Sequence, residues 1–394
     1  MVAGQQTKTS GDAHAVAAPT GRDRFIDFTR AFSLLVVVLW HWGFTLLILS
    51  PDGPHASNPI GFVSGLWIAT WLLQVMPLFF FVGGYAHMLV WHKIRENGGG
   101  YWTFVAGRLK RLLVPVALFL AVMVALGVLI GLVFPPWAAW ARSGIFLIAS
   151  PLWFIAVYVV LVFLAPPLVA LHDRFGPLVV VFLVGLAGLA DIGRFHGHMP
   201  YLGLANLVLV WGCCHQFGFF YGRLAEAPRQ TYWTFFWAGL FGLVALTNTG
   251  LYPRSMVGVP GEQISNMGPP TLCILALCVF QIGVAMLVRP WVLRKLEEPR
   301  WKRFSDAANR FSMPLFLWHT TGYAIAFGLL WLVGLHPPQE PTWQWWLLRP
   351  LYVGAALVVT IPLILASGKR WTHRQRTRPV QPRPAFARDA AGRW

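Results

Sequence analysis

DFTRAFSLLVVVLWH, at residues 27–41, is the stretch that decides the fold of this chain. Between Arg30 and His41 every residue is apolar except Ser33, which is typical of a helix that enters a membrane. Eleven helical steps of 100° return to within about 20° of the starting direction, so Arg30 and His41 share one face. The helical rise places His41 roughly 16 Å deeper than Arg30, near the middle of an apolar layer about 30 Å thick. A histidine at that depth is a candidate functional residue.

The whole chain has the composition of a membrane protein. Of its 394 residues, 57% are hydrophobic and 11% are charged, against about 25% charged in soluble domains. Long apolar segments recur along the sequence, so we expect an all-α polytopic membrane protein of about ten transmembrane helices with no soluble domain. The expected spans lie at about 31–50, 62–91, 112–134, 152–171, 177–191, 201–222, 232–250, 268–288, 311–334 and 346–367.

Basic residues indicate how these spans are oriented. With ten spans and both termini in the cytoplasm, the 31 Lys and Arg residues all face the cytoplasm except Arg142, Arg194, Arg254 and Arg349. The positive-inside rule predicts this distribution. The net charge of +17 therefore reflects topology and attraction to anionic lipid headgroups, not binding of nucleic acid. We expect an integral protein of a bacterial cytoplasmic membrane.

Three regions are expected along the chain. Residues 1–21 form a disordered cytoplasmic tail, residues 22–368 form the membrane-embedded domain, and residues 369–394 form a basic cytoplasmic tail. The four cysteines lie inside expected spans at spacings that match no metal motif, so they are expected to be apolar core residues, and no metal site is predicted. These cysteines are Cys213, Cys214, Cys273 and Cys278.

Four histidines lie within expected spans, and they are not equivalent. His87 and His215 lie near cytoplasmic span ends, where a structural hydrogen bond is the favoured interpretation. A functional role is favoured for His41 because of its depth. His319 lies deep in the ninth span behind Pro314, which frees backbone carbonyls, and both interpretations stay open for it.

Acidic residues are nearly absent from the spans, and only Asp27 and Asp191 approach span ends. Proton-driven transporters commonly use an intramembrane Asp or Glu relay. The scarcity of carboxylates and the alignment of Arg30 with His41 therefore favour an enzyme. The alternatives are a transporter that exports a glycan or small molecule without chemistry, and a purely structural or sensory membrane protein.

Five segments follow one another in a recognisable order. The first has an Asp, an Arg three residues later and a His eleven residues after the Arg, at Asp27, Arg30 and His41. The others are PLFFFVGGY at 77–85, RLKRLLVP at 108–115, LWF at 152–154 and LWH at 317–319. Together they resemble the acyltransferase-3 family of multi-pass membrane O-acyltransferases over about residues 22–367. Phe28 replaces a common Gly of that family, and Gly83 replaces a common Ser.

The resemblance implies that residues 22–368 are an acyltransferase domain. The donor would be an acyl-CoA, most simply acetyl-CoA, used from the cytoplasm as a co-substrate with no tightly bound cofactor. The acceptor would be a hydroxyl of a carbohydrate or lipid-linked glycan.

Particular residues of this chain suit such a reaction. His41 could act as general base on the acceptor hydroxyl near neutral pH. Asp27 could orient Arg30, which with Arg108 and Arg111 could hold the anionic nucleotide end of the donor. The predicted catalytic residues are His41, Arg30, Asp27 and His319, and the predicted donor-binding residues are Arg108, Arg111 and Trp153.

Overall fold

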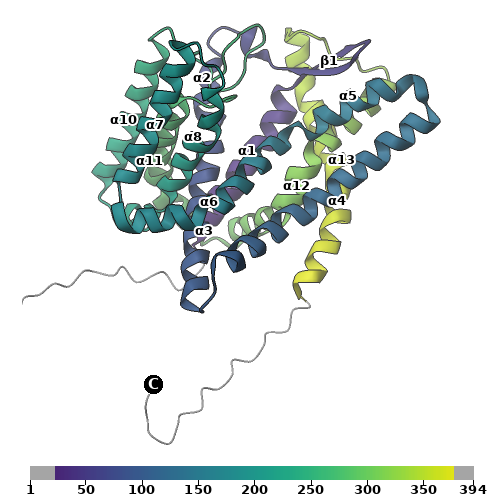
Figure 1. Cartoon of the computed structure of the whole chain (residues 1–394). Helices are drawn as coiled ribbons and strands as arrows, with labels where there is room; N and C mark the ends of the chain where they lie inside the picture. The colour runs from purple at the N-terminus through teal and green to yellow at the C-terminus, as the bar shows by residue number, and fades with distance from the viewer. Residues whose placement is uncertain (1–22, 377–394) are drawn as a thin grey trace, which may run out of the picture.

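The structure, a computed structural model, describes residues 23–376 and is built almost wholly of helices (Figure 1). The prediction of an all-α polytopic membrane protein is confirmed. The elements in chain order are α1 (Arg24–Phe44), β1 (Leu46–Ser50), β2 (Gly53–Ser57), η1 (Pro59–Gly61), α2 (Trp67–Leu73), α3 (Met76–Glu96), α4 (Tyr101–Val133), η2 (Pro135–Trp137), α5 (Ala138–Ala149), η3 (Ser150–Leu152), α6 (Trp153–Phe175), α7 (Leu178–Phe195), α8 (Leu202–Gly218), α9 (Tyr221–Glu226), α10 (Arg229–Thr247), α11 (Leu272–Lys295), α12 (Pro299–Leu332) and α13 (Trp343–Arg376).

Helix α1 begins at a side-chain cap. The carboxylate oxygen Oδ1 of Asp23 accepts hydrogen bonds from the backbone N–H groups of Phe25 and Ile26, at 2.9 and 3.0 Å. These bonds satisfy two donors that the first turn of any helix leaves without an intrahelical partner. The cap therefore fixes the start of the helix that carries Arg30 and His41.

The same helix ends earlier than the sequence suggested. It stops at Phe44, and Leu46–Ser50 form strand β1, which pairs antiparallel with β2 through a turn at Pro51 and Asp52. Pro and Asp are both favoured in turns. The prediction of helix over 31–50 is therefore wrong for its last residues, because a short apolar run has the same pattern in a strand as in a helix.

The number of membrane spans also needs correction. Eight helical stretches among the described residues are long and apolar enough to cross a membrane, against the ten predicted. The expected spans at 201–222 and 232–250 do form helices, but α8 has only 17 residues and α10 opens with the polar pair Arg229 and Gln230. Both are packed against the bundle, α8 along α3 and α7 and α10 along α11.

Other element bounds differ in ways that matter for the site. The expected span at 62–91 is divided into α2 and α3, with Pro77 in the first turn of α3, where proline is favoured. An additional helix, α5, lies between the third and fourth expected spans. Helix α12 begins at Pro299 instead of residue 311, so Asn309 and Arg310 lie on it.

One end of the bundle is closed by irregular segments and a hairpin, and we call it the hairpin end. Ser143 of α5 donates a hydrogen bond to the carbonyl oxygen of Asp52 at 3.2 Å. Asn58 donates to the carbonyl oxygen of Gly258, in the loop that joins α10 to α11, at 2.8 Å. Strand β1 and helix α5 lie together at the top of Figure 1.

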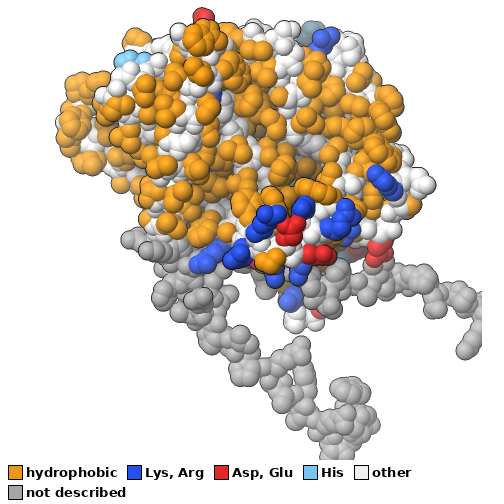
Figure 2. Space-filling view, turned by 180° about the vertical axis from the view of Figure 1, so that it is seen from behind, with side chains coloured by type: hydrophobic (Ala, Val, Ile, Leu, Met, Phe, Trp, Pro, Cys, Tyr) orange, Lys and Arg blue, Asp and Glu red, His pale blue; other side chains and the backbone are white. Residues whose placement is uncertain are grey.

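The opposite end carries the charge, and we call it the basic end. Lys and Arg side chains gather along the lower rim in Figure 2, while hydrophobic side chains cover most of the face above them. This distribution agrees with the positive-inside pattern of the sequence. The placement of the basic end and of both termini in the cytoplasm stays a prediction. The expected tail at 1–21 lies outside the described residues, and α13 continues as helix into the expected tail at 369–394 as far as Arg376.

Close helix packing fixes the centre of the bundle. The backbones of α3 and α8 touch at Gly84 and Gly218, because a Cβ at Gly84 would collide with the carbonyl group of His215 and a Cβ at Gly218 with that of Phe81. Small residues allow such close approach between membrane helices. The four cysteines are fully buried and unpaired, as expected of core residues.

Candidate active site

His41 and His319 come together from α1 and α12, although 278 residues separate them in the chain. Nε2 of His319 lies 3.3 Å from Nδ1 of His41, and the ring centroids are 5.0 Å apart. His319 is fully buried, whereas His41 is partly exposed and lines a cavity. The pair therefore presents one imidazole to the cavity and keeps the other behind it.

Backbone carbonyls fix the tautomer of both rings. Nδ1 of His319 lies 2.7 Å from the carbonyl oxygen of Phe316, and Nδ1 of His41 lies 2.8 Å from that of Val37. A carbonyl oxygen only accepts hydrogen bonds, so Nδ1 carries the proton in each neutral ring. The one Nδ1–H of His41 is therefore shared between the Val37 carbonyl oxygen, at 2.8 Å, and the unprotonated Nε2 of His319, at 3.3 Å. The unprotonated Nε2 of His41 is left as the base of the pair.

Two further bonds hold this region of α12 in place. The indole Nε1–H of Trp42 donates to the carbonyl oxygen of His319 at 2.9 Å. The hydroxyl of Thr320 donates to the carbonyl oxygen of Ile148, near the end of α5, at 2.9 Å. The first bond ties α1 to α12 at the histidine pair, and the second ties α12 to α5.

Arg30 is held by residues of the same two helices. Its Nη2 donates to the Asp27 carboxylate at 3.0 Å, and its Nε and Nη2 donate to Oδ1 of Asn309 at 3.1 and 2.8 Å. The Asn309 amide in turn donates to the backbone oxygens of Asp27 and Ser305, both at 2.9 Å. These bonds fix the guanidinium plane and tie α1 to α12 a second time, nearer the basic end.

A cavity of about 750 Å³ lies beside Arg30 at the basic end, and we call it the basic cavity. Four arginines and two carboxylates line it, so its charge is net positive. The Nη2–H of Arg108 donates to the carbonyl oxygen of Ala86 at 2.9 Å, while its buried Nε has no hydrogen-bond partner among the described residues. The charged residues of the basic cavity are Arg30, Arg108, Arg111, Arg310, Asp27 and Asp306.

A narrower cavity of about 170 Å³, the middle cavity, continues from the basic cavity into the bundle. Arg30, Arg108 and Tyr158 line both cavities, and the walls of the middle cavity are otherwise mostly apolar. Gly83 lies against the Tyr158 ring, where an added Cβ would be 3.0 Å from Cε2 and 3.2 Å from the hydroxyl oxygen. The absence of a side chain at Gly83 thus leaves room in the middle cavity beside Tyr158.

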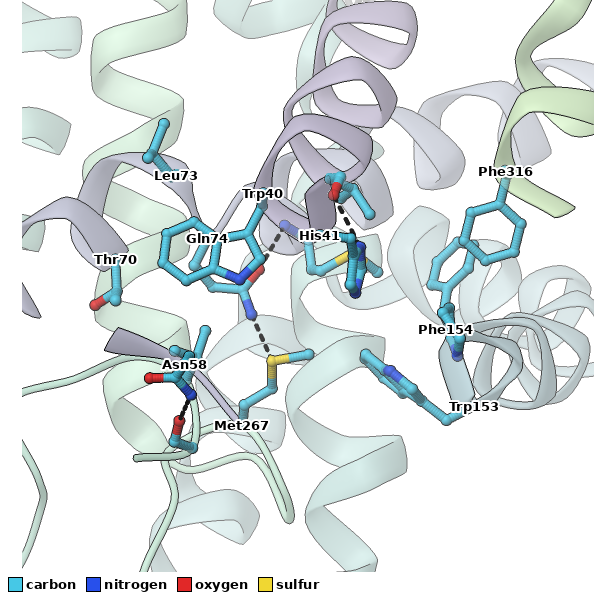
Figure 3. A pocket seen from close by; sticks show the side chains of 15 residues that line it. Trp40, His41, Asn58, Thr70, Leu73, Gln74, Trp153, Phe154, Met267 and Phe316 are labelled. Atoms are coloured by element: carbon cyan, nitrogen blue, oxygen red, sulfur yellow. Dashed lines mark hydrogen bonds between the residues drawn. The ribbon is translucent and has the colours of Figure 1, made fainter. Parts of the chain in front are cut away.

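His41 itself lines a third cavity of about 240 Å³, which we call the histidine cavity. Figure 3 shows Trp40 and Trp153 on opposite sides of the His41 ring, with Asn58 and Met267 toward the hairpin end. The Gln74 amide bridges two elements there, because its Oε1 accepts from the backbone N–H of Met76 at 3.3 Å and its Nε2 lies 2.6 Å from the Met267 sulfur. The cavity thus combines indole faces with amide groups next to one imidazole base.

A second histidine pair lies between α3 and α8. Nδ1 of His87 is 3.0 Å from Nε2 of His215, and both rings are almost fully buried. The other nitrogen of each ring has no hydrogen-bond partner among the described residues. The structural hydrogen bond expected for these histidines is thus present, although each has the other as its partner instead of a backbone carbonyl or Ser. His87 also lines the basic cavity.

The predicted site residues fall into two neighbouring groups. Arg30, Asp27, Arg108 and Arg111 all line the basic cavity, and His41 and His319 meet at the histidine cavity. Trp153, predicted to bind the donor, lines the histidine cavity instead of the basic one. The roles of all seven residues stay predictions.

Three participants were not found by sequence reasoning. Asn309 lay outside the expected ninth span, and a lone Asn carries no motif. Phe154 and Phe316 line both the middle and the histidine cavities. Phe154 was noted only as part of the LWF segment and was given no role, and Phe316 looked like an ordinary apolar residue. Among residues 23–376 no group of three or more His, Cys, Asp or Glu side chains is arranged to hold a metal ion.

Comparison with known proteins identifies the family. The model of the acyltransferase-3 family, described as an acyltransferase domain, matches residues 23–365. The chain therefore belongs to this family, which confirms the resemblance in its sequence motifs and makes it a membrane acyltransferase in broad terms. No curated protein and no solved structure matches the chain.

Proposed function

We propose that this member of the acyltransferase-3 family transfers an acyl group, most simply acetyl, from acyl-CoA to a hydroxyl of a carbohydrate or glycolipid. One observation carries the proposal. The basic, middle and histidine cavities follow one another from the basic end to His41, each sharing lining residues with the next. A donor with an anionic head and a long thin arm would fit that order.

The basic cavity suits the nucleotide end of acyl-CoA. Phosphate groups are bound well by guanidinium groups, which offer paired donors in one plane. Arg30 is already oriented by Asp27 and Asn309, so little side-chain entropy is lost when it binds an anion. Arg108 contributes a buried Nε–H that no described residue satisfies, and an oxygen of the donor would satisfy it.

The middle cavity suits the pantetheine arm. The arm must cover the helical rise between Arg30 and His41, roughly 16 Å for eleven residues. The passage is narrow, at about 170 Å³, and largely apolar, which fits a flexible chain that carries few charged groups. The thioester would then arrive beside His41.

The chemistry at His41 follows from its fixed tautomer. Nε2 of His41 takes the proton of the acceptor hydroxyl as the oxygen attacks the thioester carbonyl. The tetrahedral intermediate collapses, the C–S bond breaks, and the departing thiolate takes the proton from His41. The Nδ1–H of His41 donates to both the Val37 carbonyl oxygen and Nε2 of His319 throughout, and these acceptors keep the ring in position and favour the positive charge that it acquires.

The acceptor would reach His41 from the hairpin end. Trp40 and Trp153 offer flat apolar faces for a sugar ring, and Asn58 and Gln74 offer amide groups for its hydroxyls. With the basic end in the cytoplasm of a bacterium, as the positive-inside rule predicts, the acceptor cavity faces away from the cytoplasm.

Labelled acetyl-CoA tests the proposal directly. Membranes that contain the protein are incubated with [14C]acetyl-CoA, and label is followed into the glycan and lipid fractions. We expect ester-bound label with the natural protein and no such label with His41→Gln. The control variant His55→Gln alters an exposed histidine of β2 and should give the same label as the natural protein. Movement of a glycan across the membrane without incorporation of label would instead support the transporter.

A further inference from the structure

The junction between the middle and histidine cavities is formed by only two side chains. The basic and middle cavities adjoin along Arg30, Arg108, Tyr158 and further shared residues. Of the described residues, only Phe154 and Phe316 line both the middle and the histidine cavities. Anything that moves between these two cavities must therefore pass these rings.

The two rings are packed against each other across the junction. Their centroids lie 5.6 Å apart at an interplanar angle of 71°, an edge-to-face contact typical of aromatic pairs. Each side chain is only 6% exposed, and Figure 3 shows the rings close together beside the cavity that contains His41. In this state the contact closes the path.

The two rings differ in how firmly they are held. Phe154 on α6 contacts the rings of Phe79 and Phe80, at centroid distances of 4.9 and 5.3 Å. Phe316 lies two residues after Pro314, inside α12. Because proline has no N–H, the hydrogen bond to the carbonyl four residues earlier is missing there, and helices bend at such points. Apart from Phe154, the Phe316 ring contacts one aromatic side chain among the described residues, His319 at 6.0 Å, so Phe316 is the less enclosed of the two rings.

We propose that Phe154 and Phe316 form a gate that selects the acyl group and admits it to His41, with Phe316 as the moving part. The inference rests on the proposed function, because it takes the thioester to enter through the middle cavity. A short acyl group passes when Phe316 turns aside. The acyl group enters first, and the pantetheine arm then lies between the rings while the thioester is at His41. A longer chain requires the rings to stay apart while its whole length passes, so the gate favours short acyl groups, and it closes against water when no donor is bound.

Access of a thiol reagent tests the gate without any enzymatic readout. The native cysteines are all fully buried, so a cysteine introduced at Met76 reports on the histidine cavity and one at Ser312 reports on the two other cavities. The charged reagent sulfonatoethyl methanethiosulfonate is added to proteoliposomes from each side separately. The side from which Ser312→Cys reacts is the basic side.

From the basic side we expect Met76→Cys to react slowly, and at least tenfold faster when Phe316→Ala is added. Phe327→Ala is the matched control, since Phe327 is an equally buried phenylalanine on the same helix that lines none of the three cavities. It should leave the rate unchanged. Equal rates with and without Phe316→Ala would overturn the gate.

Chain-length selectivity gives the second test, with acetyl-, butyryl- and octanoyl-CoA as donors. We expect Phe316→Ala to raise the octanoyl-to-acetyl rate ratio at least tenfold. Phe316→Leu keeps more of the apolar bulk and serves as a second variant if Phe316→Ala does not fold, and it should raise the ratio by less. An unchanged ratio in variants that still transfer acetyl would overturn the selectivity. If the natural protein transfers no acyl group from any donor, the proposed function fails. The rates of cysteine modification would still show whether Phe154 and Phe316 close the path between the two cavities.

Discussion

The two histidine pairs resemble each other in contact but differ in what fixes their protons. The closest nitrogens are 3.3 Å apart in the His41–His319 pair and 3.0 Å apart in the His87–His215 pair. In the first pair each Nδ1 is bound to a carbonyl of its own helix, so one base is left at a cavity. In the second pair no carbonyl fixes either ring, and one nitrogen of each lacks a partner among the described residues.

The contrast shows that contact between two imidazoles does not by itself indicate chemistry. A catalytic base needs a defined tautomer, a partner that stabilises its charged form, and access to substrate. The His41–His319 pair has the first two, and His41 lines a cavity that a substrate could enter. The His87–His215 pair has the contact and burial of a structural bond, and substitutions at His41, His319 and His215 distinguish the two cases.

The largest effect is expected from His41→Gln. Glutamine retains much of the size of histidine but cannot take a proton, so we expect acyl transfer to fall by about 10²–10⁴-fold, with donor binding little changed. Turnover of labelled acetyl-CoA by purified protein in nanodiscs provides the measurement. Near-normal turnover would remove the distinction between the two pairs.

His319→Leu should come next, with a loss of about 10²-fold because the His41 ring loses one of the two acceptors that hold its orientation. His319→Gln sharpens the test, since its side-chain oxygen can accept the Nδ1–H bond of His41, and it should recover part of the rate. A purely structural role would give the two variants the same rate once both are shown to fold. The pH–rate profile should also change shape in the leucine variant only.

Arg30→Lys should have an intermediate effect, and the effect should be on donor binding instead of on the chemistry at the histidines. An ammonium group cannot reproduce the planar contacts that Arg30 makes with Asp27 and Asn309. Loss of about 1.4 kcal/mol of donor binding corresponds to a tenfold rise in the KM for acetyl-CoA. The rate at saturating donor should stay near normal, and a fall in kcat with unchanged KM would contradict the assignment of Arg30 to donor binding.

The smallest effect on catalysis is expected from His215→Leu. The change leaves the buried Nδ1 of His87 without its partner, so it should lower the free energy of unfolding by about 1–3 kcal/mol. Acetyl transfer by the folded fraction should stay within about twofold of normal, because His215 lines none of the cavities that contain the site residues. Thermal unfolding in detergent and turnover in nanodiscs separate the two effects, and a loss of turnover as large as that of His319→Leu would show that both pairs are functional.

The sequence predicted the residues of α1 well because their relation is local. Helical spacing alone places Asp27, Arg30 and His41 on nearly one face, and the structure has Asp27 and Arg30 in contact. His319 was open to two interpretations because its importance depends on which helix lies beside it. No periodicity in α12 could indicate a contact with α1 across 278 residues of sequence.

The remaining features depend on packing that the sequence pattern does not encode. Asn309 is polar and precedes residue 311, where its span was expected to start. Helix α12 begins at Pro299 instead, so Asn309 lies on it and binds Arg30. Leu46–Ser50 has the apolar character of a membrane span but finds a strand partner after a turn. Phe154 and Phe316 become informative only when the cavities on either side of them are known.

The aromatic junction has a consequence for the energy balance of the cell. Each elementary charge that crosses a membrane at 100 mV dissipates about 2.3 kcal/mol, so a water-filled passage from the basic end to the hairpin end would discharge the membrane. Apolar constrictions exclude water and ions, and the proposed gate of Phe154 and Phe316 would be such a constriction. Of the described residues that line the middle and histidine cavities, none is a carboxylate that could relay protons. A protein with cavities toward both ends can therefore remain impermeable to ions and protons.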